Sequence, residues 1–228
     1  TAKYGIRKYG FHGTSHRYVS RKAAEFLGRP IEDLKIIVCH LGNGASISAV
    51  DGGVAVETSM GLTPLQGLVM GTRSGDVDPG LHTFLVREGG WDINDVDTML
   101  NKRSGMLGLC GYTDMRDVEA QNDAGNERTK LALDIYVHRL VSYIGSYYAV
   151  LGGLDAIVFT AGVGENASPV RAAVLNRLRH FGLELDDAAN AVRSKQPRAI
   201  STPDSAVAAL VGPTNEELAM AQETLAII

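Results

Sequence analysis

Two glycine-rich segments each follow a run of apolar residues in this sequence. The segment HLGNG begins at His40, after the apolar stretch Leu34–Cys39, and AGVGEN follows the apolar stretch Ala156–Thr160. Glycines at such turns let the backbone approach an anion, and consecutive N–H groups can form a nest for phosphate. Either segment alone is also consistent with ordinary turn chemistry. Two of them after buried strands favour a nucleotide cleft between them.

Neither segment completes a standard nucleotide-binding motif. A Walker loop would end in Gly-Lys-Ser/Thr, and the dinucleotide fingerprint needs a third glycine that AGVGEN lacks. AGVGEN does open toward an expected helix, whose N-terminus would favour negative groups.

Arg73 lies between Gly-Thr and Ser-Gly in the segment MGTRSGDVDP. Its surroundings have no apolar periodicity, so the surface of a helix or strand explains it poorly. A guanidinium offers planar, permanently charged donors that suit the oxygens of a transferring phosphoryl group. The structural alternative is an ion pair with Asp76 or Asp78.

His12 and His16 lie four residues apart in FHGTSH. On a helix such a pair shares one face and resembles half of a zinc site. No Glu joins them in HExxH order and Gly13 lies between them, so we expect Thr14 or Ser15 to cap the following helix. His12 would then lie in a loop, free to donate a hydrogen bond to a phosphate oxygen. A structural histidine that caps backbone is an alternative for His16 and, less so, for His12.

Two further segments combine acidic residues with helix-start signals. Thr214 or Asn215 would cap a final helix whose first turn holds Glu216 and Glu217, and carboxylates there are favoured by the helix dipole alone. A carboxylate near a phosphate can also hold Mg²⁺ directly or through water. The segment TDMR, 113–116, resembles a capped helix start.

Composition sets broad limits on function. The chain has 228 residues, 45% of them hydrophobic, and a formal net charge of −4, which argues against a nucleic-acid-binding surface. No apolar run is long enough to cross a bilayer, so no membrane partner is expected. Cys39 lies in an apolar run and is expected to be a buried thiol, and neither it nor Cys110 forms a CxxC pair. A reducing cytoplasm fits this usage.

Periodicity predicts alternating strands and helices. Expected helices cover Ser15–Leu27, Leu81–Arg87, Ile93–Lys102, Glu127–Leu151, Pro169–His180 and the C-terminal segment to Ile228. Expected strands cover Leu34–Cys39, the hairpin Ser46–Val50 and Val54–Glu57, and Ala156–Thr160, and a short apolar stretch covers Ala206–Val211. The polar segment Asp186–Ser205 is expected to be a surface excursion. This order predicts one α/β layered unit without an internal linker.

Taken together, these segments resemble the acetate kinase family, within the superfamily of sugar kinases, actin and heat-shock ATPases. The matching stretches are YGFHGTSH, CHLGNGASISAV, TSMGLTPLQGLVMGTRSGDVDP, SGMLGLCGYTDMRDVE, FTAGVGEN and PTNEEL, which span Tyr9 to Leu218 in the family's order. The resemblance implies an actin-like, ribonuclease H-like lobe with a mixed sheet flanked by helices.

The resemblance also implies a role for each matching residue. His12 and Arg73 would contact the phosphoryl group in flight, and Glu216 would bind Mg²⁺ (or Mn²⁺). Residues of the phosphate loop and of the adenosine site would bind the nucleotide: His40, Leu41, Gly42, Asn43, Gly44, Asp114, Met115, Arg116, Gly162, Val163, Gly164, Glu165 and Asn166. ATP or ADP and a short-chain carboxylate or acyl phosphate would be the substrates, and a homodimer is expected.

One feature departs from the family pattern. Family members begin with a lobe that carries an Asn-x-Gly-Ser-Ser-Ser phosphate segment, a substrate-binding Arg and a catalytic Asp, and none of these precedes Thr1. The resemblance therefore implies that residues 1–228 are the C-terminal nucleotide-binding and dimerisation lobe, with the N-terminal lobe absent from the chain. We expect such a chain to bind ATP or ADP weakly and not to turn over by itself. The alternatives are a butyrate-type kinase or another sugar-kinase-like transferase, and a catalytically silent nucleotide-binding or dimerisation module.

Overall fold

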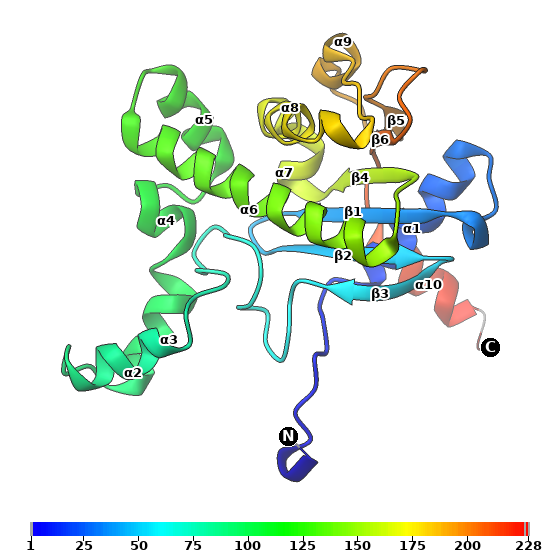
Figure 1. Cartoon of the computed structure of the whole chain (residues 1–228). Coiled ribbons are helices and arrows are strands. Elements are labelled where there is room, and N and C mark those ends of the chain that lie inside the picture. The colour runs from blue at the N-terminus through cyan, green and yellow to red at the C-terminus, as the bar shows by residue number, and fades with distance from the viewer. Residues whose placement is uncertain (1, 226, 228) are drawn as a thin grey trace.

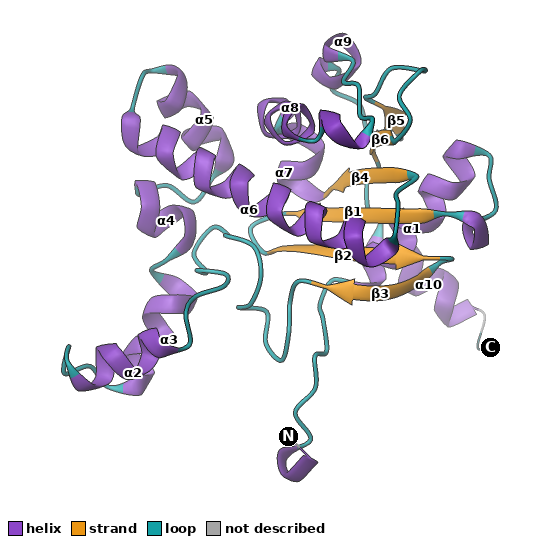
Figure 2. Ribbon diagram, in the orientation of Figure 1, coloured by secondary structure: helices purple, strands orange, loops and turns teal. Residues whose placement is uncertain are grey.

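The centre of the molecule is a six-stranded mixed sheet (Figures 1 and 2). The computed structural model describes residues 2–225 and residue 227. The strands are β1 (Lys35–Leu41), β2 (Ala45–Asp51), β3 (Val54–Thr58), β4 (Ala156–Thr160), β5 (Arg198–Ala199) and β6 (Ala208–Val211). Their order is β3-β2-β1-β4-β6-β5, with β1, β4 and β6 parallel and the other pairs antiparallel. The predicted α/β class, a mixed sheet flanked by helices, is confirmed.

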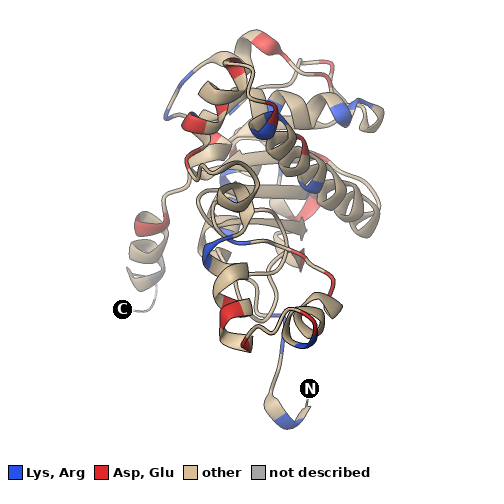
Figure 3. Cartoon of the chain, turned by 90° about the vertical axis from the view of Figure 1, so that its left-hand side faces the viewer, with Lys and Arg blue, Asp and Glu red and all other residues tan. Residues whose placement is uncertain are grey.

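The helices pack on both faces of this sheet. They are α1 (Gly13–Leu27), α2 (Gly80–Arg87), α3 (Ile93–Lys102), α4 (Gly105–Cys110), α5 (Met115–Asp123), α6 (Glu127–Leu151), α7 (Ala161–Asn166), α8 (Ser168–Arg177), α9 (Asp187–Ala191) and α10 (Glu216–Leu225), with 3₁₀ turns η1 (Ala2–Tyr4), η2 (Ile31–Asp33) and η3 (Arg179–Phe181). Figure 1 shows α6 in front of the sheet and α1 behind it. In Figure 3, acidic and basic residues are interspersed over the side shown.

Alternation along β1 separates two apolar cores. Ile37, Cys39 and Leu41 pack into the core that contains α6 and α8, whereas Ile36 and Val38 pack against α1. Cys39 is fully buried, as predicted. His40 follows the second set, so its side chain lies on the α1 face at the carboxyl end of β1.

The AGVGEN segment is a helix, α7, and not the predicted glycine loop. Ala161 adopts a left-handed conformation with φ 65° and turns the chain directly out of β4 into the first helical turn. Gly164 then packs against the strands, since a Cβ there would lie 3.3 Å from the carbonyl carbon of Phe159 and 3.5 Å from the Cys39 carbonyl oxygen. Close packing on β1 and β4 therefore stabilises a helix that glycine propensity disfavours.

Two other predictions about local structure were wrong. Neither Thr14 nor Ser15 caps α1, because the helix begins at Gly13 and the residue at its N-cap, His12, makes no side-chain capping bond. The segment 186–205 is not simply a surface excursion, because Asn190 and Ile200 are buried and β5 extends the sheet. The predicted capping of the last helix by Asn215 is confirmed, since its Oδ1 accepts from the Leu218 N–H at 2.9 Å.

No helix in the described part of the chain combines the length and apolar character needed to span a membrane.

Candidate active site

The two glycine-rich segments meet at the carboxyl ends of β1 and β4. His40 lies opposite Thr160 in the parallel register, so the turn after β1 and the start of α7 are neighbours. A Cβ at Gly42 would lie 3.9 Å from the Cβ of Ala161 and 4.0 Å from Nε2 of His40. Ligands of open α/β sheets bind at this edge, outside the carboxyl ends of the strands.

A pocket of about 700 Å³ opens beside this junction. Its walls come from the turn after β1, the start of α5, α7 and the segment after α9: Gly42, Asn43, Thr113, Asp114, Met115, Arg116, Glu119, Gly162, Val163, Asn166, Ala167 and Arg193. The volume lies within the range of small-molecule and cofactor sites. Nothing lies within 4 Å of the position that a Cβ would take at Gly162, so the first turn of α7 presents bare backbone to the pocket.

Asp114 and Arg116 form an ion pair on the rim of this pocket. Asp114 caps α5 by accepting from the Arg116 N–H at 2.9 Å, and its carboxylate also accepts from Nε of Arg116 at 3.0 Å. The hydrogen bonds from the Arg116 side chain and backbone lower the pKa of Asp114 to about 2. The Arg116 side chain is 88% exposed, so its planar face is free to cover a ligand in the pocket.

Buried polar groups hold α7 in place beneath the pocket. Nη1 of Arg171 donates to the carbonyl oxygens of Gly164 and Glu165 at 3.0 and 2.9 Å, and the same guanidinium bonds both oxygens of Asn190. The side chain of Glu165 accepts from the Ala161 N–H at 3.1 Å. Burial raises the pKa of Glu165 despite this bond and a second from the Thr214 backbone.

The loop that carries Arg73 is fixed by backbone contacts. Nη1 of Arg73 donates to the Pro64 carbonyl at 3.0 Å, so the alternative of an ion pair with Asp76 or Asp78 is not what the structure shows. A Cβ at Gly105 would lie 2.2 Å from the Met70 carbonyl oxygen, and Gly105 has φ 60°, so only glycine fits there.

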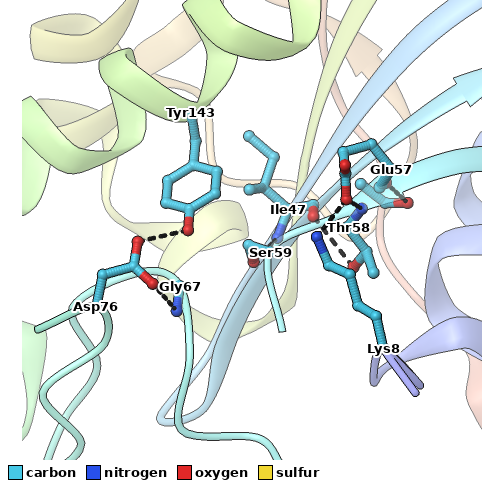
Figure 4. Close-up of polar contacts among 9 residues, drawn as sticks. Lys8, Ile47, Glu57, Thr58, Ser59, Gly67, Asp76 and Tyr143 are labelled. Atoms are coloured by element: carbon cyan, nitrogen blue, oxygen red, sulfur yellow. Dashed lines mark hydrogen bonds and ion pairs between the residues drawn. The ribbon is translucent and has the colours of Figure 1, made fainter. Parts of the chain in front are cut away.

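Asp76 binds partners other than Arg73 (Figure 4). Its carboxylate accepts from the Gly67 N–H at 3.0 Å, the Tyr143 hydroxyl at 2.6 Å and Arg139 at 2.7 Å. These bonds join the Arg73 loop to α6. Across the same view, Lys8 contacts Glu57, and the Ser59 hydroxyl accepts from the Ile47 N–H at 3.0 Å.

Arg73 and His12 converge on Gly44, next to the pocket. A Cβ at Gly44 would lie 3.3 Å from Nη1 of Arg73 and 3.7 Å from Cε1 of His12. The His12 and His40 rings stack with centroids 4.0 Å apart. A guanidinium and two imidazoles therefore line the edge of the HLGNG turn, where an anion would meet several donors.

These histidines are neutral at pH 7. Burial is the main cause of a lowered pKa in all three: it lowers the pKa of His16 to about 3 and that of His40 to about 4, and it also lowers the pKa of His12. For His12, the negative charge of Glu216 opposes this shift and the positive charge of Arg73 adds to it, which places both charged groups near the imidazole.

His12 and His16 share one hydrogen-bond partner. His12 precedes α1 in the left-handed region, with φ 60°, and both His12 and His16 bond the hydroxyl of Ser46, so neither caps backbone. Within residues 2–225 and 227, no group of three His, Cys, Asp or Glu side chains could hold a metal ion. Glu216 begins α10, where the helix dipole favours it.

The structure brings most of the predicted site residues together, but not all of them. Gly42, Asn43, Asp114–Arg116, Gly162, Val163 and Asn166 line the pocket, and His12, His40, Gly44 and Arg73 lie beside it. Leu41 and Gly164 are buried beneath it, and Glu165 bonds backbone groups. Their contribution is to position the backbone.

Sequence reasoning missed Glu119 and Arg193, which also line the pocket. Glu119 lies four residues after Met115 and shares its face of α5, so the predicted helix start could have indicated it. Arg193 carries no local signal, because it reaches the pocket through the folding of the segment after α9.

The site and fold define a nucleotide-sized pocket at the carboxyl edge of an α/β sheet, with cationic and neutral donors next to it. The sequence matches the Acetokinase family over residues 1–222. The chain therefore belongs to the Acetokinase family.

Similar proteins agree with this assignment. The chain is 58% identical to the acetate kinase of Streptomyces avermitilis over 99% of the chain and 56% of that protein, and 56% identical to the acetate kinase of Desulfotalea psychrophila with the same coverage. The structure resembles Porphyromonas gingivalis acetate kinase with a TM-score of 0.96 at 45% identity, covering 99% of this chain and 57% of that one. The structure also resembles a propionate kinase from Francisella tularensis with a TM-score of 0.91 at 45% identity, covering 97% of this chain and 56% of that one. The chain thus spans little more than half the length of these relatives.

Proposed function

We propose that this chain is the C-terminal nucleotide-binding and dimerisation lobe of an enzyme that transfers a phosphoryl group reversibly between ATP and a short-chain carboxylate, acetate or propionate. The observation that carries the proposal is the convergence of Arg73 and His12 on Gly44, beside a pocket of about 700 Å³. Acetate and propionate are named because the relatives described above are acetate and propionate kinases.

The residues would divide the work between binding and transfer. The pocket walls at Asp114–Arg116 and α7 would hold the adenosine, and the HLGNG turn would hold the phosphates. Arg73 and His12 would donate to the oxygens of the phosphoryl group as it moves to the carboxylate oxygen, which yields acyl phosphate and ADP. The attacking carboxylate is already ionised at neutral pH, so catalysis rests on positioning and charge neutralisation.

Glu216 fits a magnesium ion that is bound mainly by nucleotide phosphates. Mg²⁺ keeps several waters and takes one or two carboxylates in such sites, and the described residues offer no cluster for a site built from protein alone. The negative charge of Glu216 acts to raise the pKa of His12, which supports a role for Glu216 close to the phosphoryl group. Bound there, the ion would neutralise phosphate charge.

Calorimetric titration of the chain with ATP and Mg²⁺ tests the pocket. We expect weak binding that is lowered severalfold in Arg116→Ala and unchanged in Arg87→Ala, which removes an exposed arginine of α2. Equal affinities in all three proteins would contradict the pocket assignment.

A hydroxamate assay on the same chain should detect no acyl phosphate. A rate of acyl phosphate formation comparable to that of an intact kinase would contradict the proposal that the chain is one lobe of the enzyme.

The role of Arg73 is tested in the longer protein. If the reading frame upstream of Thr1 encodes the Asn-x-Gly-Ser-Ser-Ser segment, Arg73→Ala in that protein should lower kcat by orders of magnitude while nucleotide binding survives. Equal loss of both would mean that Arg73 is structural.

Homodimer formation, carried over from the family resemblance, predicts a mass twice the 24.3 kDa of the chain by light scattering.

A further inference from the structure

The hydroxyl of Ser46 lies between two imidazoles. Ser46 Oγ is 2.9 Å from Nδ1 of His12 and 2.7 Å from Nε2 of His16. Ser46 is fully buried on β2, directly opposite His40 on β1, and its hydroxyl bonds no other group among the described residues. One hydroxyl proton therefore has to be shared between two rings.

Three arrangements of the protons are conceivable. Burial keeps both imidazoles neutral, so each ring carries one N–H. If both rings donate to Ser46, the hydroxyl proton is buried without an acceptor, which costs about 1–3 kcal/mol. Both hydrogen bonds must therefore point the same way: either His16 donates to Ser46 and Ser46 donates to His12, or the reverse.

His16 decides the direction. Its other nitrogen, Nδ1, is buried and has no partner in the described part of the chain. The reverse direction would place an N–H at this position, and orphaned buried N–H groups are rare in proteins. It would also force both rings into the Nδ1–H form, which is the less stable tautomer of a free neutral imidazole. The forward direction leaves both rings in the more stable Nε2–H form.

We propose that Ser46 and His16 are positioning residues that fix the tautomer of His12: His16 Nε2–H donates to Ser46 Oγ, Ser46 O–H donates to His12 Nδ1, and His12 presents Nε2–H to the phosphoryl group. The nitrogen that remains on His12 bonds no described residue and is not sealed in the core, in contrast to Nδ1 of His16. The left-handed backbone of His12 places its ring over Ser46 although the conformation is uncommon outside glycine.

The neighbouring pair follows the same logic. Ser15 Oγ lies 2.8 Å from Nδ1 of His40, and this fully buried hydroxyl bonds no other described group. Ser15 O–H must then donate to His40 Nδ1, which leaves an Nε2–H on His40. The stacked rings of His12 and His40 therefore offer two parallel neutral donors beside the Arg73 guanidinium. Neutral donors can bind a phosphoryl oxygen without the added cost of burying positive charge. The role of these donors toward phosphate rests on the proposed function, whereas the tautomer assignment does not.

Long-range ¹H–¹⁵N correlation spectra of the ¹⁵N-histidine-labelled chain test the proposal at pH 7.5, without nucleotide. We expect His12, His16 and His40 to show the Nε2–H pattern, with His12 assigned by its loss in His12→Gln. In Ser46→Ala, His12 Nδ1 loses its donor, so its resonance should move downfield. Ser46→Thr keeps the hydroxyl and should restore the wild-type position. Ser48→Ala is the matched control, because Ser48 is a buried serine of β2 whose hydroxyl donates to the Glu57 carbonyl.

A proton on Nδ1 of His12 in the wild-type chain would overturn the proposal, as would an unchanged His12 spectrum in Ser46→Ala. If Ser46→Ala does not fold, the wild-type and Ser46→Thr spectra still decide the tautomer. Addition of ATP and Mg²⁺ then separates the two claims: an Nε2–H resonance that does not respond to saturating ATP counts against the proposed function and leaves the tautomer assignment standing.

Discussion

At the scale of single residues, Gly44 sets the distance between the HLGNG turn and the groups that would bind the phosphates. Both Nη1 and Nη2 of Arg73, at 3.3 and 3.6 Å, and Cε1 of His12, at 3.7 Å, lie next to the position that a Cβ would take. Gly44 therefore matters because it has no side chain, and not because its backbone conformation is unusual. The added methyl group of an alanine would enter the space between the Arg73 guanidinium and the His12 ring.

Gly44→Ala should weaken ATP binding to this chain about tenfold, or about 1.4 kcal/mol. The methyl group pushes the Arg73 guanidinium by a few tenths of an ångström and occupies part of the approach to the turn. Adenosine, which lacks phosphates, should bind equally to both proteins in calorimetric titrations. Gly145→Ala on α6, where a Cβ meets nothing within 4 Å, should leave ATP binding intact. A parallel loss for adenosine and ATP would locate the damage in the adenosine site.

At the scale of elements, periodicity predicted those that are stabilised by their own apolar pattern. Helices α1 and α6 and strands β1, β2 and β4 were predicted from the apolar residues that form their buried faces, whereas β3 has no buried residue and was predicted as the second strand of a hairpin. Helix α7 was missed because its stability comes from close packing of Gly164 and from Arg171, which is ten residues from the start of the helix. Strand β5 was missed because it has only two residues, neither of them buried, and is defined by its pairing with β6.

The site residues also differ in whether the sequence predicts them. The motif residues around Gly42, Arg73 and Asp114 could be predicted because glycine, arginine and helix-cap chemistry are visible locally. The hydroxyl of Ser46 could not, since its role depends on the β1–β2 register that places it opposite His40 and below His12.

Arg171→Met should therefore destabilise the fold by about 3–5 kcal/mol. Arg171 is 1% exposed, and its loss leaves the Gly164 and Glu165 carbonyls and Asn190 without their donors, at about 1–3 kcal/mol for each group that stays buried. Equilibrium urea unfolding measures the change. Arg177→Met is the matched control, because this arginine of α8 pairs with the exposed Asp134 and should cost less than about 1 kcal/mol. Similar losses in both variants would show that α7 does not depend on the buried guanidinium.

At the scale of the whole molecule, the histidine cluster links stability to pH. His16 has a folded pKa of about 3 and His40 of about 4, whereas the unfolded value is about 6.5, so the unfolded chain binds more protons between these limits. Stability is fully present above about pH 6.5 and falls as the pH decreases toward the folded values. Glu119 and Glu165 have pKa values raised mainly by burial, so their titration opposes this trend.

Between pH 6.5 and pH 5.5, the free energy of unfolding should fall by about 1 kcal/mol for each buried histidine, or about 2 kcal/mol for His16 and His40 together. Urea unfolding at pH 7.5, 6.5 and 5.5 gives the slope of the unfolding free energy against pH. This slope is a better readout than absolute stability, because substitution of a buried histidine also changes packing. His16→Gln should remove about half of the slope even where it lowers stability at every pH. His138→Gln, at an exposed position of α6, should leave the slope unchanged. A wild-type stability that stays flat over this range would mean that the imidazoles accept protons in the folded chain, and the neutral donor arrangement around Ser46 would then be wrong as well.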